Sequence, residues 1–170
     1  MTYGTNPFQD RRNMVEVQSE KWRPPLFSRP SHALGSRFRQ ALRRFVDVQA
    51  GSTWRDLSAV LPQVRGKILD VGCGAQPYRP LIHAKATYIA IDTDKAKAHF
   101  GYEMPDTTYF SGERWPIDDE SVDFILCTET MEHVLDPPAF LTEAWRCLNQ
   151  GGTILLTVPF AARWHFIPYD

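Results

Sequence analysis

The residue types best suited to bind a ligand are gathered in residues 67–81, KILDVGCGAQPYRPL. An acid, Asp70, closes a short apolar run there, and two glycines, Gly72 and Gly74, follow it closely. Glycines at such a turn let the backbone fold tightly and let a ligand approach without meeting a side chain. A second acid, Asp92, comes about twenty residues after the turn, the spacing that places a carboxylate on ribose hydroxyls. Together these features predict a site for a nucleoside-bearing ligand.

The residues after the glycines argue against a dinucleotide as that ligand. A dinucleotide turn needs a third small residue three positions after the second glycine, where a helix begins at the pyrophosphate. Pro77 holds that position, and Pro80 follows it. Prolines remove backbone donors that a pyrophosphate would use, and Asp70 would repel a diphosphate. The expected ligand therefore carries a positive charge and no phosphate.

Four apolar runs bounded by turn residues predict the strands that position these side chains: KILDVG, TYIAID, SVDFILCTE and GTILLTVPF. Their continuous apolar character is typical of strands buried on both faces. Residues 137–152 show apolar side chains at helical spacing, and residues 149–152 are expected to end that helix. Strands that alternate with helical segments indicate an α/β fold with a Rossmann-like, doubly wound and mostly parallel sheet.

Two helices are predicted before the first strand. Apolar side chains at helical spacing indicate one helix around residues 34–45, whose arginines are interpreted as a solvated face in preference to a phosphate site. A second helix is expected to start at a cap, Ser52 or Thr53, and to end before Pro62. Its apolar side would consist of Trp54, Leu57, Val60 and Leu61.

Length and composition favour one globular domain with short additions. A chain of 170 residues is divided here into an N-terminal arm (1–30), a helical extension (31–65) and a ligand-binding domain (66–170) that is incomplete at its C-terminal end. The formal net charge of −1 gives no global attraction to nucleic acid or to an anionic membrane, and no apolar run has membrane-spanning length. Three widely spaced cysteines predict reduced core thiols, no metal site and a cytoplasmic protein.

Four motifs, ILDVGCG, YIAID, PIDDESVDFILCTETMEHVLDP and NQGGTILLTVPF, occur in this order over residues 66–160. Their order and spacing resemble those of class I S-adenosylmethionine-dependent methyltransferases. The resemblance implies S-adenosyl-L-methionine as cofactor and a small molecule as methyl acceptor. Such enzymes usually continue beyond the fifth strand, so the last strands of the usual seven-stranded sheet are expected to be missing here.

The resemblance also assigns roles to individual residues. Asp92 would accept hydrogen bonds from the ribose hydroxyls, and Ser111 replaces an aspartate that often binds the adenine amino group. His133 would act as general base, with bracing of a helix entry by Glu132 and His133 as the alternative. The residues expected along the cofactor, from its methionine end to its adenine and then toward the acceptor, are Asp70, Gly72, Cys73, Gly74, Asp92, Thr93, Ser111, Gly112, Thr128 and Glu129.

Two alternatives to an active enzyme remain open. One is a truncated or non-catalytic methyltransferase-fold subunit that binds the cofactor or a partner without turnover. The other is a protein that binds NAD or a nucleotide sugar, which Pro77 and the missing third glycine disfavour. A fifth strand at the sheet edge would expose unpaired backbone groups, so either the sequence is a fragment of a longer enzyme, which is the preferred interpretation, or a partner chain covers this edge. Nucleic acid and membranes are not expected partners.

Overall fold

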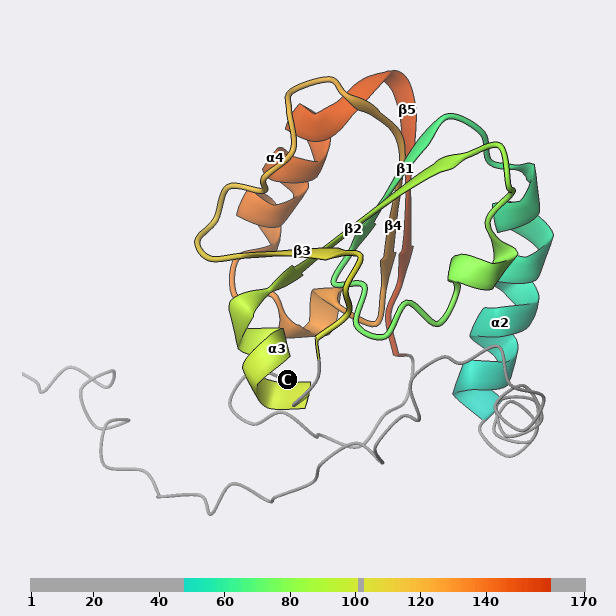
Figure 1. Cartoon of the computed structure of the whole chain (residues 1–170), viewed down its shortest axis with the longest axis horizontal. Coiled ribbons are helices and arrows are strands. Elements are labelled where there is room, and N and C mark those ends of the chain that lie inside the picture. The colour runs from blue at the N-terminus through green and yellow to red at the C-terminus, as the bar shows by residue number, and fades with distance from the viewer. Residues whose placement is uncertain (1–47, 101–102, 160–170) are drawn as a thin grey trace, which may run out of the picture.

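The computed structural model describes residues 48–100 and 103–159, which form a five-stranded sheet with helices on both faces (Figure 1). The order in the sheet is β3-β2-β1-β4-β5, and every neighbouring pair is parallel. The chain builds the sheet outward from β1 in one direction and then crosses to β4 on its other side. This order confirms the predicted Rossmann-like, doubly wound sheet. The strands are β1 (Lys67–Val71), β2 (Thr87–Thr93), β3 (Thr107–Phe110), β4 (Val122–Thr128) and β5 (Leu148–Thr157).

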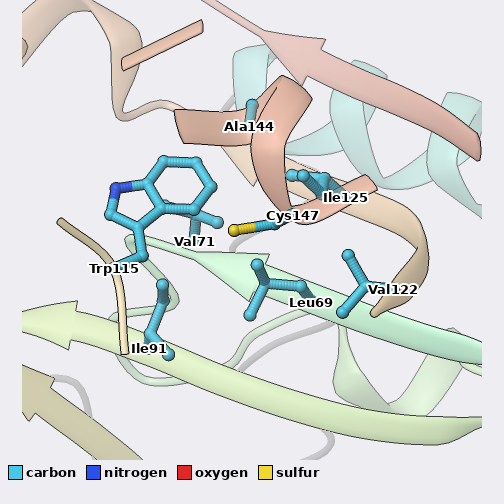
Figure 2. Packing of buried hydrophobic residues seen from close by; sticks show 8 residues of the cluster. All are labelled: Leu69, Val71, Ile91, Trp115, Val122, Ile125, Ala144 and Cys147. Atoms are coloured by element: carbon cyan, nitrogen blue, oxygen red, sulfur yellow. The ribbon is translucent and has the colours of Figure 1, made fainter. Parts of the chain in front are cut away.

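One face of the sheet is covered by helix α4 (Pro137–Cys147). Asp136 caps the start of this helix through the Ala139 N–H, and Cys147 and Ala144 point into the core shown in Figure 2. The helix ends earlier than predicted, because Leu148 adopts an extended conformation and begins β5 directly. The expected stop at residues 149–152 was therefore wrong.

The opposite face is covered by helix α2 (Val48–Val60) and the 3-10 turn η2 (Leu61–Gln63). Leu57 and Leu61 are buried against Ile68, Phe124 and Leu126 of the sheet. The predicted cap at Ser52 or Thr53 was wrong, since both lie inside α2, and Val60 is 39% exposed. The helix predicted around residues 34–45 lies outside the described residues.

The connection from β1 to β2 contains no α-helix. Pro77 and Pro80 restrict the backbone and lack N–H donors, and the connection forms only the 3-10 turn η3 (Arg79–Leu81). Gln76 is 3% exposed and stabilises this segment, donating to Thr107 Oγ1 (2.9 Å) and accepting from Arg79 (2.8 Å). Two further short elements border the carboxyl ends of the strands, namely α3 (Asp94–Phe100) and η4 (Met131–His133).

Candidate functional site

The carboxyl ends of β1, β2 and β4 meet where the strand order reverses, which is the ligand-binding edge of such sheets. Asp92 organises the turn after β1 from the neighbouring strand. Its carboxylate accepts the Gly74 N–H at 2.9 Å and the Thr93 N–H at 2.8 Å. Burial raises the pKa of Asp92, and these two backbone bonds oppose the rise. The predicted ribose acceptor thus also fixes the glycine turn.

Asp70 is buried at the end of β1, with 2% of its surface exposed. One carboxylate oxygen accepts the Tyr88 hydroxyl at 2.5 Å, and the other, Oδ1, has no hydrogen-bond partner among the described residues. Burial raises the pKa of Asp70 to about 7; the Tyr88 bond opposes this rise and the nearby charge of Asp92 adds to it. The described part of the chain offers neither acid an ion pair with Lys, Arg or His.

Glycine is needed at the two positions of the turn for different structural reasons. Gly72 has a φ of +69°, and a side-chain carbon there would overlap the Thr130 side chain. Gly74 has a φ of +48° and gives its N–H to Asp92. Gly72 is thus required by the close approach of the segment after β4, a reason in addition to the predicted approach of a ligand.

The thiol between these glycines is part of the core. Cys73 is 3% exposed, and its sulfur lies 3.4 Å from Thr107 Oγ1. Burial raises the pKa of this thiol to about 12, as it does for Cys127 on β4. All three cysteines are buried and free. A thiol that stays protonated is a packing group and a poor nucleophile.

The ends of β2 and β3 carry the residues expected near adenine. Thr93 caps α3, since its Oγ1 accepts the Ala96 N–H at 3.2 Å. Ser111 directly follows β3 and donates its hydroxyl to Asp94 Oδ2 at 2.5 Å. Gly112 has a φ of +95°, and a side-chain carbon there would meet no atom within 4 Å.

The segment after β4 is bound to the end of β5 and to the end of β4 itself. Glu129 has a φ of +51°, its N–H donates to the Thr157 carbonyl (3.0 Å), and its carboxylate accepts the Thr157 hydroxyl (2.8 Å). Thr130 donates to the Thr128 carbonyl at 3.0 Å. The η4 turn follows, where His133 Nε2 lies 3.9 Å from Glu132 Oε1. Thr130, which directly follows the predicted Glu129, contacts Gly72 of the glycine turn.

Sequence reasoning missed four residues that complete this arrangement: Tyr88, Asp94, Thr130 and Thr157. Tyr88 could have been found from the sequence. Side chains alternate between the two faces of a strand, so Tyr88 lies on the same face of β2 as Asp92. The other three are recognised only through contacts between segments far apart in the sequence, which no periodicity records. Among the described residues, no group of three or more His, Cys, Asp and Glu side chains is arranged to hold a metal ion. No helix within the described segments is long and apolar enough to span a membrane.

Comparisons with known proteins show the family of the chain. The sequence matches a family described as "Methyltransferase domain" over residues 37–168. A ubiquinone biosynthesis O-methyltransferase of Dinoroseobacter shibae is 30% identical over 148 residues, which are 82% of this chain and 58% of that protein. A probable S-adenosylmethionine-dependent methyltransferase of Mycolicibacterium smegmatis is 32% identical over 96 residues, which are 54% of this chain and 37% of that protein.

A solved structure from Thermotoga maritima, described as a SAM-dependent methyltransferase and possible histamine N-methyltransferase, is similar with a TM-score of 0.49 and 25% identity. The similarity covers 72% of this chain and 56% of that one. The chain spans 58% and 37% of the two sequence relatives named above. The family match over residues 37–168 includes every described strand and confirms the predicted resemblance: the chain belongs to the methyltransferase domain family.

Proposed function

We propose that this chain binds S-adenosyl-L-methionine and belongs to an enzyme that transfers a methyl group to a small molecule. The observation that carries the proposal is the pair of buried carboxylates, Asp70 and Asp92, at the edge where the strand order reverses. Neighbouring buried acids are costly unless a positive charge compensates them. S-adenosylmethionine has a sulfonium and an ammonium group and no phosphate, so it fits this site better than a dinucleotide does.

The residues around the two acids fit the parts of this cofactor. Asp92 accepts two backbone bonds and, as an ionised carboxylate, retains capacity for ribose hydroxyls. Asp70 Oδ1 is a buried acceptor with no described partner and suits a cationic donor. We propose that the remaining cofactor contacts come from the glycine turn and from the ends of β2, β3 and β4: Gly72, Cys73, Gly74, Thr93, Ser111, Gly112, Thr128 and Glu129.

The relatives support a hydroxyl group of a small molecule as the acceptor, since several are named O-methyltransferases. When bound, the cofactor supplies an electrophilic methyl group on a positively charged sulfur. We propose that His133 takes the proton of the acceptor hydroxyl, because it lies on η4 next to Glu132, and η4 follows Thr130, which contacts Gly72 of the glycine turn. Alignment and exclusion of water would supply the rest of the catalysis.

The proposal extends to the organisation of the longer protein. Residues 66–170 would hold the cofactor half, and the extension over residues 31–65 together with the arm over residues 1–30 would contribute to the acceptor side. A further polypeptide would cover the β5 edge, and the buried, free thiols support a cytoplasmic location. The balanced formal charge supports small molecules as partners in preference to nucleic acid.

Calorimetry and thermal denaturation of the purified chain test the proposal. S-adenosylmethionine and S-adenosylhomocysteine are expected to bind and to raise the melting temperature, and NADH is expected to do neither. Asp92→Asn should weaken binding, whereas Asp123→Asn, at the opposite end of the sheet, should not. Stabilisation by NADH alone would overturn the proposal. Binding without transfer of a labelled methyl group to hydroxylated small molecules would favour the non-catalytic subunit.

A further inference from the structure

Tyr88 holds the buried acid Asp70 by its hydroxyl group. In the parallel pairing of β1 and β2, Asp70 is the register partner of Ala90, and Tyr88 precedes Ala90 by two residues. Tyr88 and Asp70 therefore lie on the same face of the sheet as diagonal neighbours, a separation that an aromatic side chain can span. The Tyr88 hydroxyl donates to Asp70 Oδ2 at 2.5 Å. Because Tyr88 lies farther from the carboxyl ends of the strands, it reaches the acid from the side away from the ligand-binding edge.

The ring of Tyr88 is covered by a guanidinium that is itself held in place. The central carbon of the Arg79 guanidinium lies 5.1 Å from the centre of the ring. Arg79 donates to Gln76 Oε1 and to Asp106 Oδ2, both at 2.8 Å. A cation over an aromatic face is attracted to it, so these contacts fix the orientation of the ring. Burial and the charge of Asp70 raise the pKa of Tyr88, and the charge of Arg79 opposes this rise.

The other ionisable groups near Asp70 give its negative charge no support. Asp92 on β2 is a second acid, and its charge raises the pKa of Asp70 further. Burial raises the pKa of the Cys73 and Cys127 thiols to about 12, so both are neutral near pH 7. Glu132 on η4 adds a negative charge beside Cys127, and helix α2 contributes apolar side chains to this face. Against burial, the hydrogen bond from Tyr88 is the contribution that favours the ionised form of Asp70.

We propose that Tyr88, braced by Arg79, is a positioning residue that prepares Asp70 for the ammonium group of the ligand. Tyr88 occupies Oδ2 and leaves Oδ1, which has no hydrogen-bond partner among the described residues, for that group. A sulfonium has no hydrogen to donate, so the ammonium is the cation that can satisfy this acceptor. Tyr88 also stabilises the ionised carboxylate that a cation requires. The inference rests on the proposed function, because it takes a ligand with an ammonium group to bind at Asp70.

Calorimetric titration of the full chain with S-adenosylhomocysteine and with 5′-methylthioadenosine tests this role. Both compounds contain adenosine, and only the first carries the ammonium group, so the ratio of their affinities separates its contribution from the titration of Asp92. Measurements from about pH 5.5 to about pH 8.5 span the Asp70 pKa of about 7. The wild-type ratio is expected to fall as the pH decreases through this range, because Asp70 becomes protonated. In Tyr88→Phe the ratio should be about fivefold lower near pH 7, and the pH at which it falls should move up by about one unit.

Tyr109→Phe is the matched control. Tyr109 also lies under a cation, with Lys97 Nζ 5.5 Å from the centre of its ring, but its hydroxyl accepts the Met104 N–H at 3.0 Å. Its pH profile should follow that of the wild type. Asp70→Asn should make the ratio independent of pH, and the addition of Tyr88→Phe to this variant should then change nothing further.

An unmoved pH profile in Tyr88→Phe, with both compounds still bound, would overturn the role of Tyr88 and leave the proposed function intact. A wild-type chain that binds neither compound would overturn the proposed function and this inference with it. Arg79→Gln is a second variant that leaves the core undisturbed, because Arg79 is exposed. It should move the profile in the same direction by a smaller amount, and no movement would contradict the bracing of Tyr88. Circular dichroism of each variant excludes loss of folding as the cause.

Discussion

Asp70 is the residue at which ligand binding and stability oppose each other. Burial raises its pKa from the ordinary value of 3.8 to about 7, so the folded chain keeps this carboxyl neutral where the unfolded chain ionises it. The stability that this carboxyl contributes is fully present below the unfolded pKa and is lost as the pH rises through the folded one. A bound cation would offset the loss by compensating the charge.

Asp70→Asn should therefore stabilise the free chain in alkaline solution. We expect its free energy of unfolding to exceed that of the wild type by up to about 4 kcal/mol near pH 8, and by less than half of that near pH 5. Urea denaturation at both pH values measures the difference. Asp123→Asn is the control. The Lys67 N–H and Asn149 lower the pKa of Asp123, so its substitution should lower the free energy of unfolding instead of raising it. A gain that does not depend on pH would contradict the role of Asp70.

Gly72 and Gly112 are a matched pair for separating backbone strain from side-chain overlap. Both have positive φ, but only at Gly72 would a side-chain carbon overlap Thr130. Gly72→Ala should cost about 3 kcal/mol of unfolding free energy and Gly112→Ala about 1 kcal/mol, as measured by chemical denaturation. Thr130→Ala should recover part of the loss in the Gly72→Ala background. Equal losses at the two glycines would show that Thr130 does not constrain the turn.

At the scale of elements, Arg146 of α4 fixes the loop between β3 and β4. Its guanidinium donates to the Ile117 carbonyl (2.8 Å), to Asp119 (2.6 Å) and to Glu143 (2.7 Å). Trp115 of this loop packs edge-on against the Phe140 ring at 4.9 Å, and its indole closes the core beside Cys147 (Figure 2). The loop that follows Ser111 is thus anchored to helix α4.

Arg146→Lys should loosen this loop without unfolding the sheet, because a single ammonium cannot replace the forked contacts of the guanidinium. We expect a loss of about 2 kcal/mol in unfolding free energy and faster amide hydrogen exchange over residues 115–119. Arg114→Lys is the control, since Arg114 forms an exposed ion pair with Asp119, and its effect should stay within about 0.5 kcal/mol. Similar exchange rates in both variants would contradict the anchoring role of Arg146.

Four of the five described strands could be predicted from sequence, because each contains a continuous apolar run between turn residues, and burial on both faces demands such a run. The four predicted runs did not include β3, which has two threonines among its four residues and no fully buried side chain. Helix boundaries were less predictable. Ser52 and Thr53 are good caps by residue type, yet they lie inside α2, where packing of Leu57 and Leu61 determines the helix. The stop expected at residues 149–152 failed because a tight connection leads from α4 into β5 at once.

The candidate site was predictable where its residues adjoin strand ends, as for Asp70, Asp92 and the glycine turn. Contacts across loops could not be predicted, because they depend on which residues the folded backbone brings together. The bond from Ser111 to Asp94 joins residues that are 17 positions apart, and neither has a distinctive motif of its own. The hydrogen bond from the Gly74 N–H to Asp92 likewise joins residues that are far apart in the sequence.

At the scale of the whole molecule, an apolar strip on α4 is exposed. Trp145 is 80% exposed and Leu141, one helical turn earlier, is 44% exposed; on the edge strand β5, Leu156 is 39% exposed. Large exposed side chains next to an edge strand favour association. We expect the chain alone to self-associate as its concentration rises in sedimentation velocity experiments, and Trp145→Gln with Leu141→Gln to reduce that association. Identical sedimentation of the variant and the wild type would contradict this role.

Glu129 couples the candidate site to the end of the edge strand. Its left-handed backbone conformation is uncommon for a residue with a side chain, and both its N–H and its carboxylate are bound by Thr157 at the end of β5. One residue, Thr130, connects it to η4, which carries the Glu132–His133 pair. One threonine at the end of β5 therefore links the edge strand to the segment that leads into the turn carrying His133.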